Sequence, residues 1–372
     1  MRFPEFTEEW EETTLGKISE ITKGSGISKD QLSEQGSPCI LYGELYTKYK
    51  SEIIDEVYSR TELDSSSLVK SKANDVIIPC SGETAIDIST ARCVPFNNIL
   101  LGGDLNIIRL KHDDGGFFAY QLNGARKKDI ARVAQGVSVV HLYGENLKHI
   151  RVYHPAIEEQ KKITRLLSLI DERIATQNKI IEDLKLLKSA ISLNVLHSDT
   201  WEQFKIKDIA QIGRGRVISS IEISQQKNPT YPVYSSQTSN DGIMGYLDDY
   251  MFEGEYISWT TDGANAGTVF YRNGKFNCTN VCGLLKLIKG FDTHFVSLVL
   301  AEATKKYVSI NLANPKLMNN TMGNIQICLP KLEEQKRISI VFRVLQRLWT
   351  VHNSLLTEYI KQKQYLLSQM FI

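Results

Sequence analysis

The sequence lacks the patterns that mark several common classes of site and segment. Its six cysteines include no Cys-x-x-Cys pair and lie in apolar runs, so we expect free, buried thiols in a reducing compartment and no metal site. No stretch approaches 18 uninterrupted apolar residues, which argues against a membrane-spanning helix. The start, MRFPEFTEEW, is acidic and has no apolar core, so we do not expect a secretory signal. These absences together predict a cytoplasmic protein.

A strong net charge is also missing. The 44 basic and 43 acidic residues leave a formal charge of +1. Many nucleic-acid-binding domains are strongly basic. A role on DNA would therefore require local placement of cations, or a partner that completes the binding surface.

Catalytic motifs are absent as well. The sequence has no GxxxxGK[ST] phosphate loop, no HExxH and no GxSxG, and its seven histidines do not show metal-ligand spacing. The stretch NPTY at 228–231 resembles the Asn-Pro-Pro-Tyr loop of N6-adenine methyltransferases, but Thr230 replaces the second proline and no glycine-rich cofactor loop precedes it. We therefore predict no catalytic residue in this chain.

What the sequence does contain is an internal duplication. PAIEEQKKI at 155–163 returns as PKLEEQKRI at 330–338, and WEETTLGKISEITKGSGIS at 10–28 matches WEQFKIKDIAQIGRGRVIS at 201–219. Two copies are too few for a solenoid, and 372 residues suffice for two domains. We predict an α+β fold with two similar globular domains, each followed by a long helix. The predicted boundaries are 1–155 and 198–330 for the domains, and 156–197 and 331–372 for the helices.

Short strand signals separated by turns fill both globular parts. The first part shows them in SPCILYGELY, NDVIIPCSG and ILLGGDLNIIRLK, and the second in YPVYSS, GEYISWTTDG, GTVFYRNGKF and NVCGLLKLIK. The Asn-Gly pair in RNGK (272–275) predicts a tight hairpin. Helical patterns near 117–132 and 293–307 complete each part.

Each long helix carries apolar residues on a heptad repeat, starting at Ile163 and at Ile338. One helix cannot bury such a stripe alone, so we predict an antiparallel coiled coil of the two; docking of each helix on another protein is the alternative. The predicted seam consists of Ile170, Ile174, Ile181, Leu184, Ile191, Leu345, Trp349, Leu356, Tyr359 and Leu366. The predicted register pairs Gln177 with Lys363 and Lys188 with His352.

Candidate DNA contacts lie on turns, loops and basic helix surface. Lys-Gly-Ser-Gly (23–26) and Gly-Arg-Gly-Arg (213–216) place cations on turns at the same point of both domains, where they suit phosphates; plain solvated turns are the alternative. Polar loops carry side chains able to read base edges. The candidates are Lys23, Ser25, Ser81, Glu83, Thr84, Arg126, Lys127, Ser138, Arg214, Arg216, Ser236, Gln237, Thr261, Asp262, Asn265 and Lys316.

The layout as a whole resembles the specificity subunit of type I restriction–modification systems, over essentially the full chain. The resemblance rests on the Trp-Glu…Gly openings (Trp10 to Gly24, Trp201 to Gly215), on the repeated Pro-x-x-Glu-Glu-Gln phrase, on YPVY (231–234) and on GANAGTVFY (263–271). It implies two target recognition domains, each reading one half of an asymmetric, split double-stranded DNA target.

The resemblance further implies that the helix pair sets the spacer between the half-sites and docks two methyltransferase subunits, with restriction (translocase) subunits as further partners. S-adenosylmethionine, ATP and Mg²⁺ would then be bound by those partners, and this chain would bind no cofactor and catalyse nothing. Two other functions stay open: a stand-alone N6-adenine methyltransferase, which would need a cofactor loop, and a coiled-coil scaffold whose globular ends bind proteins.

Overall fold

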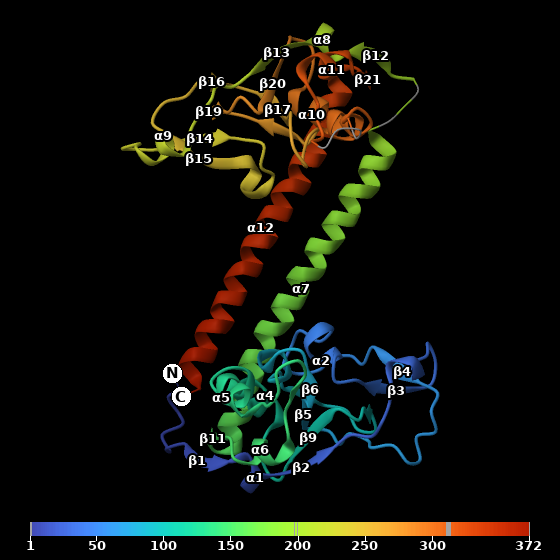
Figure 1. Ribbon diagram of the computed structural model, residues 1–372, viewed down its shortest axis with the longest axis vertical. Helices are drawn as coiled ribbons and strands as arrows, with labels where there is room; N and C mark the ends of the chain where they lie inside the picture. Colours follow the sequence, from blue (N-terminus) through green and yellow to red (C-terminus); the bar gives the residue numbers. More distant parts are fainter. Residues whose placement is uncertain (1, 197, 199, 310–313, 372) are drawn as a thin grey trace. The chain divides into compact units, whose positions relative to one another are not determined.

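The computed structural model describes residues 2–196, 198, 200–309 and 314–371. The chain forms two compact units (Figure 1). The first unit comprises residues 1–180 and 352–372, and the second comprises residues 181–351. Each unit holds one globular α+β domain and a part of both long helices, α7 (Ile157–Val195) and α12 (Leu332–Met370). The predicted boundary at residue 197 falls outside the described residues.

The first unit is built on a four-stranded antiparallel sheet with the order β2-β9-β5-β7 and a smaller sheet with the order β4-β3-β8. The strands of these sheets are β2 (Ser19–Lys23), β9 (Leu105–Leu110), β5 (Asp75–Pro79), β7 (Arg92–Val94), β4 (Ser59–Thr61), β3 (Ser37–Ile40) and β8 (Leu100–Leu101). Two further pairs are β1 (Glu11–Thr14) with β11 (Arg151–His154) and β6 (Ser81–Gly82) with β10 (Val140–His141). The helices are α1 (Leu15–Ile18), α2 (Glu44–Thr47), α3 (Ala85–Ile88), α4 (Gly115–Asn123), α5 (Lys127–Val133) and α6 (Gly144–Lys148), with the 3-10 turn η1 (Lys29–Gln31).

The second unit repeats this plan, with a four-stranded antiparallel sheet of order β13-β20-β17-β18 and a second sheet of order β15-β14-β19-β16. The strands are β13 (Ala210–Arg214), β20 (Cys282–Leu287), β17 (Tyr256–Thr260), β18 (Val269–Arg272), β15 (Ile243–Leu247), β14 (Tyr231–Tyr234), β19 (Lys275–Cys278) and β16 (Phe252–Glu253). The pair β12 (Glu202–Lys205) and β21 (Gln326–Leu329) corresponds to β1 and β11. The helices are α8 (Ile206–Ile209), α9 (Ser220–Ser224), α10 (Thr293–Ala303) and α11 (Asn319–Asn324), with the 3-10 turns η2 (Ser239–Gly242) and η3 (Thr304–Lys306).

The cores of the two domains use equivalent side chains. Trp10 packs edge-on against Phe117 with ring centroids 5.6 Å apart, and Trp201 packs in the same way against Phe295 at 5.9 Å. Both phenylalanines are completely buried. The repeated Trp-Glu opening is therefore a core anchor, and the common sheet order together with these contacts confirms the predicted duplication.

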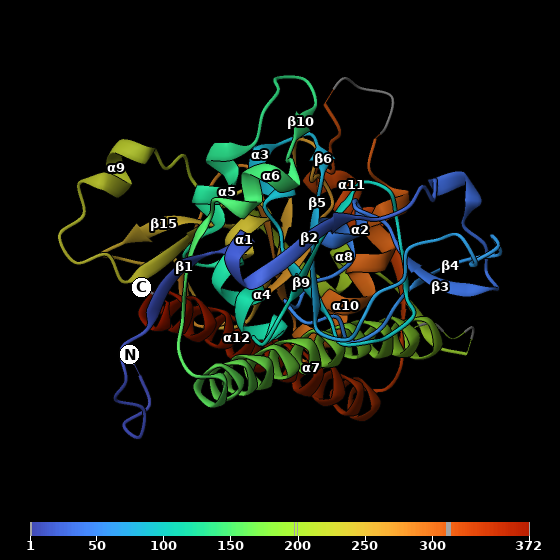
Figure 2. The same cartoon turned by 90° about the horizontal axis from the view of Figure 1, so that it is seen from below.

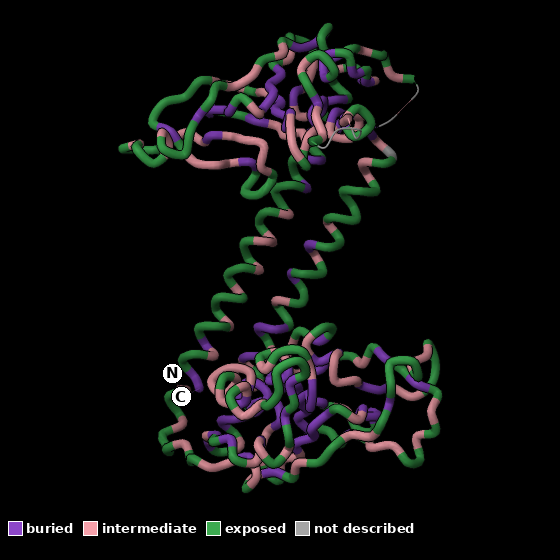
Figure 3. Tube along the Cα trace, in the orientation of Figure 1, coloured by how far each residue is buried: buried purple, intermediate pink, exposed green. Residues whose placement is uncertain are grey.

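The long helices α7 and α12 span 39 residues each, roughly 58 Å at 1.5 Å per residue. Among the ten predicted seam residues, Ile170, Ile181, Leu345 and Leu366 are buried and the other six are half-buried. Figure 3 shows that burial is dense in the globular parts and sparse along the middle of each helix. No helix in the described part of the chain is long and apolar enough to cross a membrane.

Two local predictions were wrong. The stretch SPCILYGELY is a strand only at its start, because Glu44–Thr47 forms the helix α2. The RNGK turn does join two strands, with Gly274 at a φ of +99°, but these strands do not form a hairpin with each other. Strand β18 pairs with β17 and strand β19 pairs with β16, so the turn carries the chain from one sheet to the other.

Candidate nucleic-acid interface

The glutamine of the repeated phrase fastens each long helix to its domain. In the first unit, the Gln160 side chain accepts a hydrogen bond from the Asp114 backbone N–H (2.9 Å) and donates one to the carbonyl of the proline that opens the phrase (2.8 Å). In the second unit, Gln335 accepts from the Asp292 N–H (3.0 Å) and donates to the corresponding proline carbonyl (2.8 Å). Both glutamines are almost completely buried. The phrase is thus a structural junction.

The aspartates at these junctions also begin a core helix. Asp114 accepts a hydrogen bond from the Phe117 N–H (2.8 Å), and Asp292 accepts one from the Phe295 N–H (2.7 Å). Each aspartate is the N-cap of its helix, α4 or α10. The long helix is therefore tied to the same residue that starts the helix packed under the sheet.

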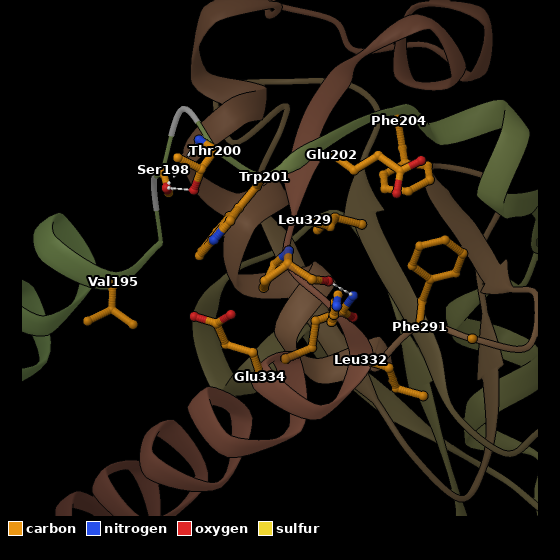
Figure 4. A pocket seen from close by; sticks show the side chains of 14 residues that line it. Val195, Ser198, Thr200, Trp201, Glu202, Phe204, Phe291, Leu329, Leu332 and Glu334 are labelled. Carbon is orange, nitrogen blue, oxygen red and sulfur yellow. Dashed lines mark hydrogen bonds between the residues drawn. The ribbon is translucent and has the colours of Figure 1, made fainter.

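The glutamate before each glutamine has a different environment in the two units. Glu159 is buried and accepts two hydrogen bonds from the Arg2 guanidinium, at 2.9 and 2.6 Å. Glu334 is exposed, and no cation contacts it within the described chain. It lines a cavity of about 920 Å³ together with Trp201 and Phe291 (Figure 4). Among the described residues, an ion pair with the N-terminal segment closes the first junction and not the second.

The glycine of each predicted phosphate-binding turn is required by close packing. A Cβ at Gly24 would overlap the carbonyl oxygen of Gly102, and a Cβ at Gly215 would overlap that of Cys278. In both domains a β-bridge joins this backbone to the neighbouring loop. The bridge links Ser25 to Gly102 in the first domain and Arg216 to Thr279 in the second. The turns are therefore packed closely against the neighbouring backbone and bridged to it.

Some side chains of these turns already make hydrogen bonds within the domain, whereas one is exposed. Lys23 is exposed, whereas the Ser25 hydroxyl accepts a hydrogen bond from a backbone N–H at 2.8 Å. Arg214 donates to the side chain of Asn319 at 2.9 Å. Arg216 is paired with Glu222, and this hydrogen bond holds the pKa of that carboxyl below its usual value. Contact of Arg216 with a phosphate would require it to leave or share its carboxylate.

Three candidates of the first unit lie near α3. Ser81 is buried and donates a hydrogen bond to Asp104 at 3.3 Å. Thr84 caps α3 by accepting a hydrogen bond from the Asp87 N–H at 3.1 Å. Glu83 between them is exposed. Of the three, Thr84 and Glu83 are accessible to a ligand.

The loop that leads into β10 projects at the top of Figure 2, and Ser138 in this loop is exposed. Backbone hydrogen bonds in both directions between Gln135 and His141 (2.9 and 2.7 Å) close the base of the loop. Its neighbour Val137 is 97% exposed. The structure therefore leaves Ser138 exposed on this loop.

Arg126 and Lys127 point inward more than predicted. The Arg126 guanidinium lies 4.9 Å from the centre of the Tyr153 ring and 3.5 Å from Asp129. Lys127 is half-buried near Thr90, and burial lowers the pKa of its amine. Both cations are used within the domain.

In the second unit, Ser236 and Gln237 belong to a loop that runs from Ser235 to Gly242. The Ser235 N–H donates to the Gly242 carbonyl at 2.9 Å and closes this loop. The Gln237 side chain donates to the carbonyl of Ile243. Both candidates are half-buried on a closed, ordered loop.

The remaining candidates surround the loop after β17. Thr261 is buried and donates to the Val281 carbonyl at 3.0 Å, so it has a structural role. The structure brings Asp262 and Lys316 together as an ion pair at 3.9 Å. Asn265 is exposed. These positions offer donors and acceptors at one edge of the domain.

The antiparallel pairing of α7 and α12 is confirmed, but the predicted register is wrong. Gln177 lies 2.7 Å from His352, not beside Lys363. Lys188 donates to Gln346 at 3.4 Å, not to His352. The apolar heptad alone left the register open, since the same stripe fits at shifts of one heptad.

Lys363 sits instead in a buried ionic cluster of the first unit. Its amine lies 2.6 Å from Asp171 and 2.5 Å from Glu52, while the Tyr120 hydroxyl donates to Asp171 at 2.7 Å. Burial raises the pKa of Asp171 although Lys363 opposes this shift, and burial beside Asp171 raises the pKa of Tyr120. The cluster joins both long helices to the first globular domain.

The sequence analysis missed two buried arginines on the corresponding edge strands β7 and β18. Arg92 donates to the carbonyls of Leu45 (3.0 Å) and Tyr49 (2.9 Å). Arg272 donates to the Asp241 carboxylate at 2.9 Å. The available signal was an arginine inside an otherwise apolar strand, which requires a partner when buried.

The thiols have the properties of core residues. The six cysteines are free, and five of them are buried. Burial raises the pKa of Cys39 and Cys80 to about 11 and that of Cys93 to about 12. No group of three or more His, Cys, Asp or Glu residues in the described chain could hold a metal ion.

Comparison with known proteins places the chain in one family. The model of the type I restriction modification DNA specificity domain matches twice, over residues 7–186 and 198–361. A putative type I specificity subunit of Mycoplasma pneumoniae is 36% identical over 206 residues, which are 54% of this chain and 85% of that protein. The specificity subunit of the M. pneumoniae type I restriction enzyme MpnII is 43% identical over 150 residues, 40% of this chain and 44% of that subunit.

The fold has the same relatives. The crystal structure of the type I restriction–modification S subunit from M. genitalium superposes with a TM-score of 0.75 at 16% identity, covering 100% of this chain and 97% of that one. A chain from a structure of the assembly and conformational transition of a type I system superposes with a TM-score of 0.53 at 14% identity, over 98% of both chains. Both family matches fall on the duplicated domain and its helix, and the chain belongs to the family of type I restriction modification DNA specificity proteins.

Proposed function

We propose that this chain is the non-catalytic, DNA-reading subunit of a type I restriction–modification complex, and that each globular domain reads one half of an asymmetric bipartite target. The observation that carries this proposal is that the two units share their architecture but differ in their loops. The sheet order and the glutamine junction are the same in both units, whereas the loops that carry the polar candidates differ in length and composition. Two different readers on one repeated frame suit a target with two different halves.

The two long helices fix the spacer between the half-sites and dock two methyltransferase subunits. Support comes from apolar side chains that α12 leaves exposed at helical spacing, which mark a protein-binding face. They include Ile340, Val344, Leu348, Val351 and Leu355. The methyltransferase subunits supply S-adenosylmethionine, and restriction subunits supply ATP- and Mg²⁺-dependent steps, so this chain itself binds none of the three.

The near-neutral charge fits such an assembly. Specific DNA binding draws much of its affinity from neutralised phosphates, and a chain with a charge of +1 has few cations to spare. Partner subunits therefore provide a large share of the phosphate contacts. The exposed candidates Lys23, Ser138 and Asn265 supply contacts from this chain. The complex works on DNA in the cytoplasm.

Methylation mapping tests the proposal directly. DNA from cells that carry this chain and its cognate methyltransferase should show N6-methyladenine in a bipartite motif, and the motif should vanish when this chain is deleted. Exchange of residues 1–155 for those of a relative should change one half of the motif only. Methylation that persists without this chain would contradict the proposal.

A second measurement separates the two other functions. The chain alone should not bind S-adenosylmethionine in a calorimetric titration, and binding there would favour a stand-alone methyltransferase. The complex with methyltransferase subunits should bind the mapped DNA motif. Complex formation without any DNA binding would favour a protein-interaction scaffold.

A further inference from the structure

Arg272 is a buried cation that contacts one loop and three neighbouring side chains. Its side chain is 1% exposed, and its Nε donates to the Ser258 hydroxyl at 3.0 Å. The guanidinium carbon lies 3.6 Å from the centre of the Tyr234 ring and 4.4 Å from that of Phe270. A planar cation that lies close to two aromatic rings is held in position before it makes any further contact.

The further contact of Arg272 is with the loop from Ser235 to Gly242. The Asp241 carboxylate accepts from Nη1 at 2.9 Å, although the Asp241 side chain itself is 69% exposed. Asn240, Asp241 and Gly242 have φ values of +49°, +53° and +81°. Left-handed backbone at two consecutive non-glycine residues is unfavourable unless other contacts hold it. The ion pair with Arg272 is such a contact.

The corresponding edge strand of the first unit carries its own buried arginine. Arg92 is 7% exposed, lies on β7, and donates to the carbonyl of Leu45 within α2 and to that of Tyr49, two residues after the end of α2. Residues 48–51, together with Ile53, Asp55 and Tyr58, line a cavity of about 540 Å³ beside α7 and α12. Both domains thus use an edge-strand arginine to hold a segment that lies outside the four-stranded sheet.

Neither arginine is available for DNA itself, because both are buried. Their partners are main-chain carbonyls in one domain and an exposed carboxylate in the other. The segments they hold have unrelated sequences, ELYTKY in the first unit and SSQTSNDG in the second. In each domain a buried edge-strand arginine therefore holds one segment, and the two segments differ in sequence.

We propose that Arg272 is a positioning residue for target recognition: through Asp241 it sets the Ser235–Gly242 loop that reads the second domain's half-site. This inference rests on the proposed function and adds a residue that fixes the geometry of that reading loop. Direct base contacts come from the polar side chains of the loop, such as Ser236 and Gln237. Discrimination between bases depends on placing such groups accurately.

Asp241→Asn is the most informative variant, because it removes the carboxylate at an exposed position and leaves the buried guanidinium and its ring contacts in place. In the reconstituted complex with methyltransferase subunits, we expect selectivity for the cognate base over other bases in the second domain's half-site to fall about tenfold, within the range of a single base contact. The first half-site should be unchanged. Arg272→Lys should act in the same half only.

Asp208→Asn is the matched control, an exposed aspartate on α8 of the same domain, and it should leave both half-sites unchanged. Thermal unfolding of Asp241→Asn should remain cooperative with a lowered midpoint, because the buried Arg272 loses its counter-charge, and selectivity is therefore measured well below that midpoint. An unchanged motif in Asp241→Asn, or equal loss of selectivity in both halves, would overturn the inference. A wild-type complex that methylates no bipartite motif would instead refute the proposed function, so the two failures are distinguishable.

Discussion

The two helix junctions share a glutamine but differ in the charges around it. The first unit adds the Arg2–Glu159 pair and the buried cluster of Lys363, Asp171 and Glu52. The second unit has an exposed Glu334 and the exposed Lys188–Gln346 hydrogen bond at the corresponding places. The comparison separates what every copy of this module needs from what one copy has added: the glutamine belongs to the common frame, and the ionic cluster belongs to the first unit.

Removing the cation of the cluster should have the largest effect. Lys363→Met leaves Glu52 and Asp171 buried without a counter-charge, so we expect the free energy of unfolding of the first unit to fall by about 3–5 kcal/mol. Lys188→Met, at the corresponding place in the second unit, should cost less than about 0.5 kcal/mol because that lysine is exposed. Hydrogen exchange of peptides from each unit measures both. Equal costs for the two variants would show that the units are held alike.

The glutamine variants should behave as a matched pair. Gln335→Ala removes two hydrogen bonds and Gln160→Ala removes three, and both leave buried backbone groups without a partner, so each should cost roughly 2–4 kcal/mol in its own unit. Gln160 makes a further hydrogen bond to Asp113 (2.8 Å), which places its cost at the upper end. Calorimetry of the two variants checks this order. A cost below 1 kcal/mol for either one would mean that its junction is held by something else.

The glycine of the second turn gives a smaller effect with its own control. Gly215→Ala drives a methyl group into the Cys278 carbonyl, so we expect a loss of about 1–3 kcal/mol. Gly213→Ala, two residues away, meets nothing within 4 Å and should be neutral or slightly stabilising. Urea unfolding of the two variants compares them. The same clash predicts that Gly24→Ala weakens the first unit.

The smallest expected effect is the pH dependence that His294 gives to the second unit. Burial and the nearby Arg343 lower the pKa of His294 to about 4, against an ordinary value of 6.5. Between these values the unfolded chain binds the proton and the folded chain does not, so stability is full above about pH 6.5 and declines as the pH falls toward 4. Because His294 is only half-buried, we expect a loss of about 1–2 kcal/mol over this window.

The first unit contains an internal control for this pH dependence. At the corresponding place, two residues after the capping aspartate, it has Gly116 instead of a histidine. Unfolding curves at pH 7 and pH 4.5 should therefore show a larger shift in the second unit. His294→Gln should remove most of the difference, and an unchanged shift in that variant would assign it to other groups.

The shared architecture of the two units was predictable from sequence because its motifs occur twice in the chain. Trp10 and Trp201 revealed the duplicated core, and the heptads revealed the helix pair. The register of the helix pair was not predictable, because an apolar stripe fits its partner at several shifts. Contacts of long polar side chains such as Lys363 with a third element determine which shift is adopted. A sequence also does not reveal that Asp241 meets Arg272 across two sheets.

The candidate DNA contacts were likewise predictable only in part. Loop composition located the Ser138 tip and the loop of Gln237, since polar side chains on turns are a local signal. It also selected Thr261, which is buried, and Arg216, which is paired with Glu222. Composition identifies which side chains are polar, but only the folded backbone decides which of them are already satisfied.

The glutamine junction has a consequence for how new specificities arise. Gln160 and Gln335 hold their helices mainly through backbone groups and a proline carbonyl, so the attachment does not depend on which loops the domain carries. A genetic crossover within the nine-residue phrase would exchange one whole domain and keep its glutamine junction. The gene can then acquire a new recognition sequence in a single recombination event.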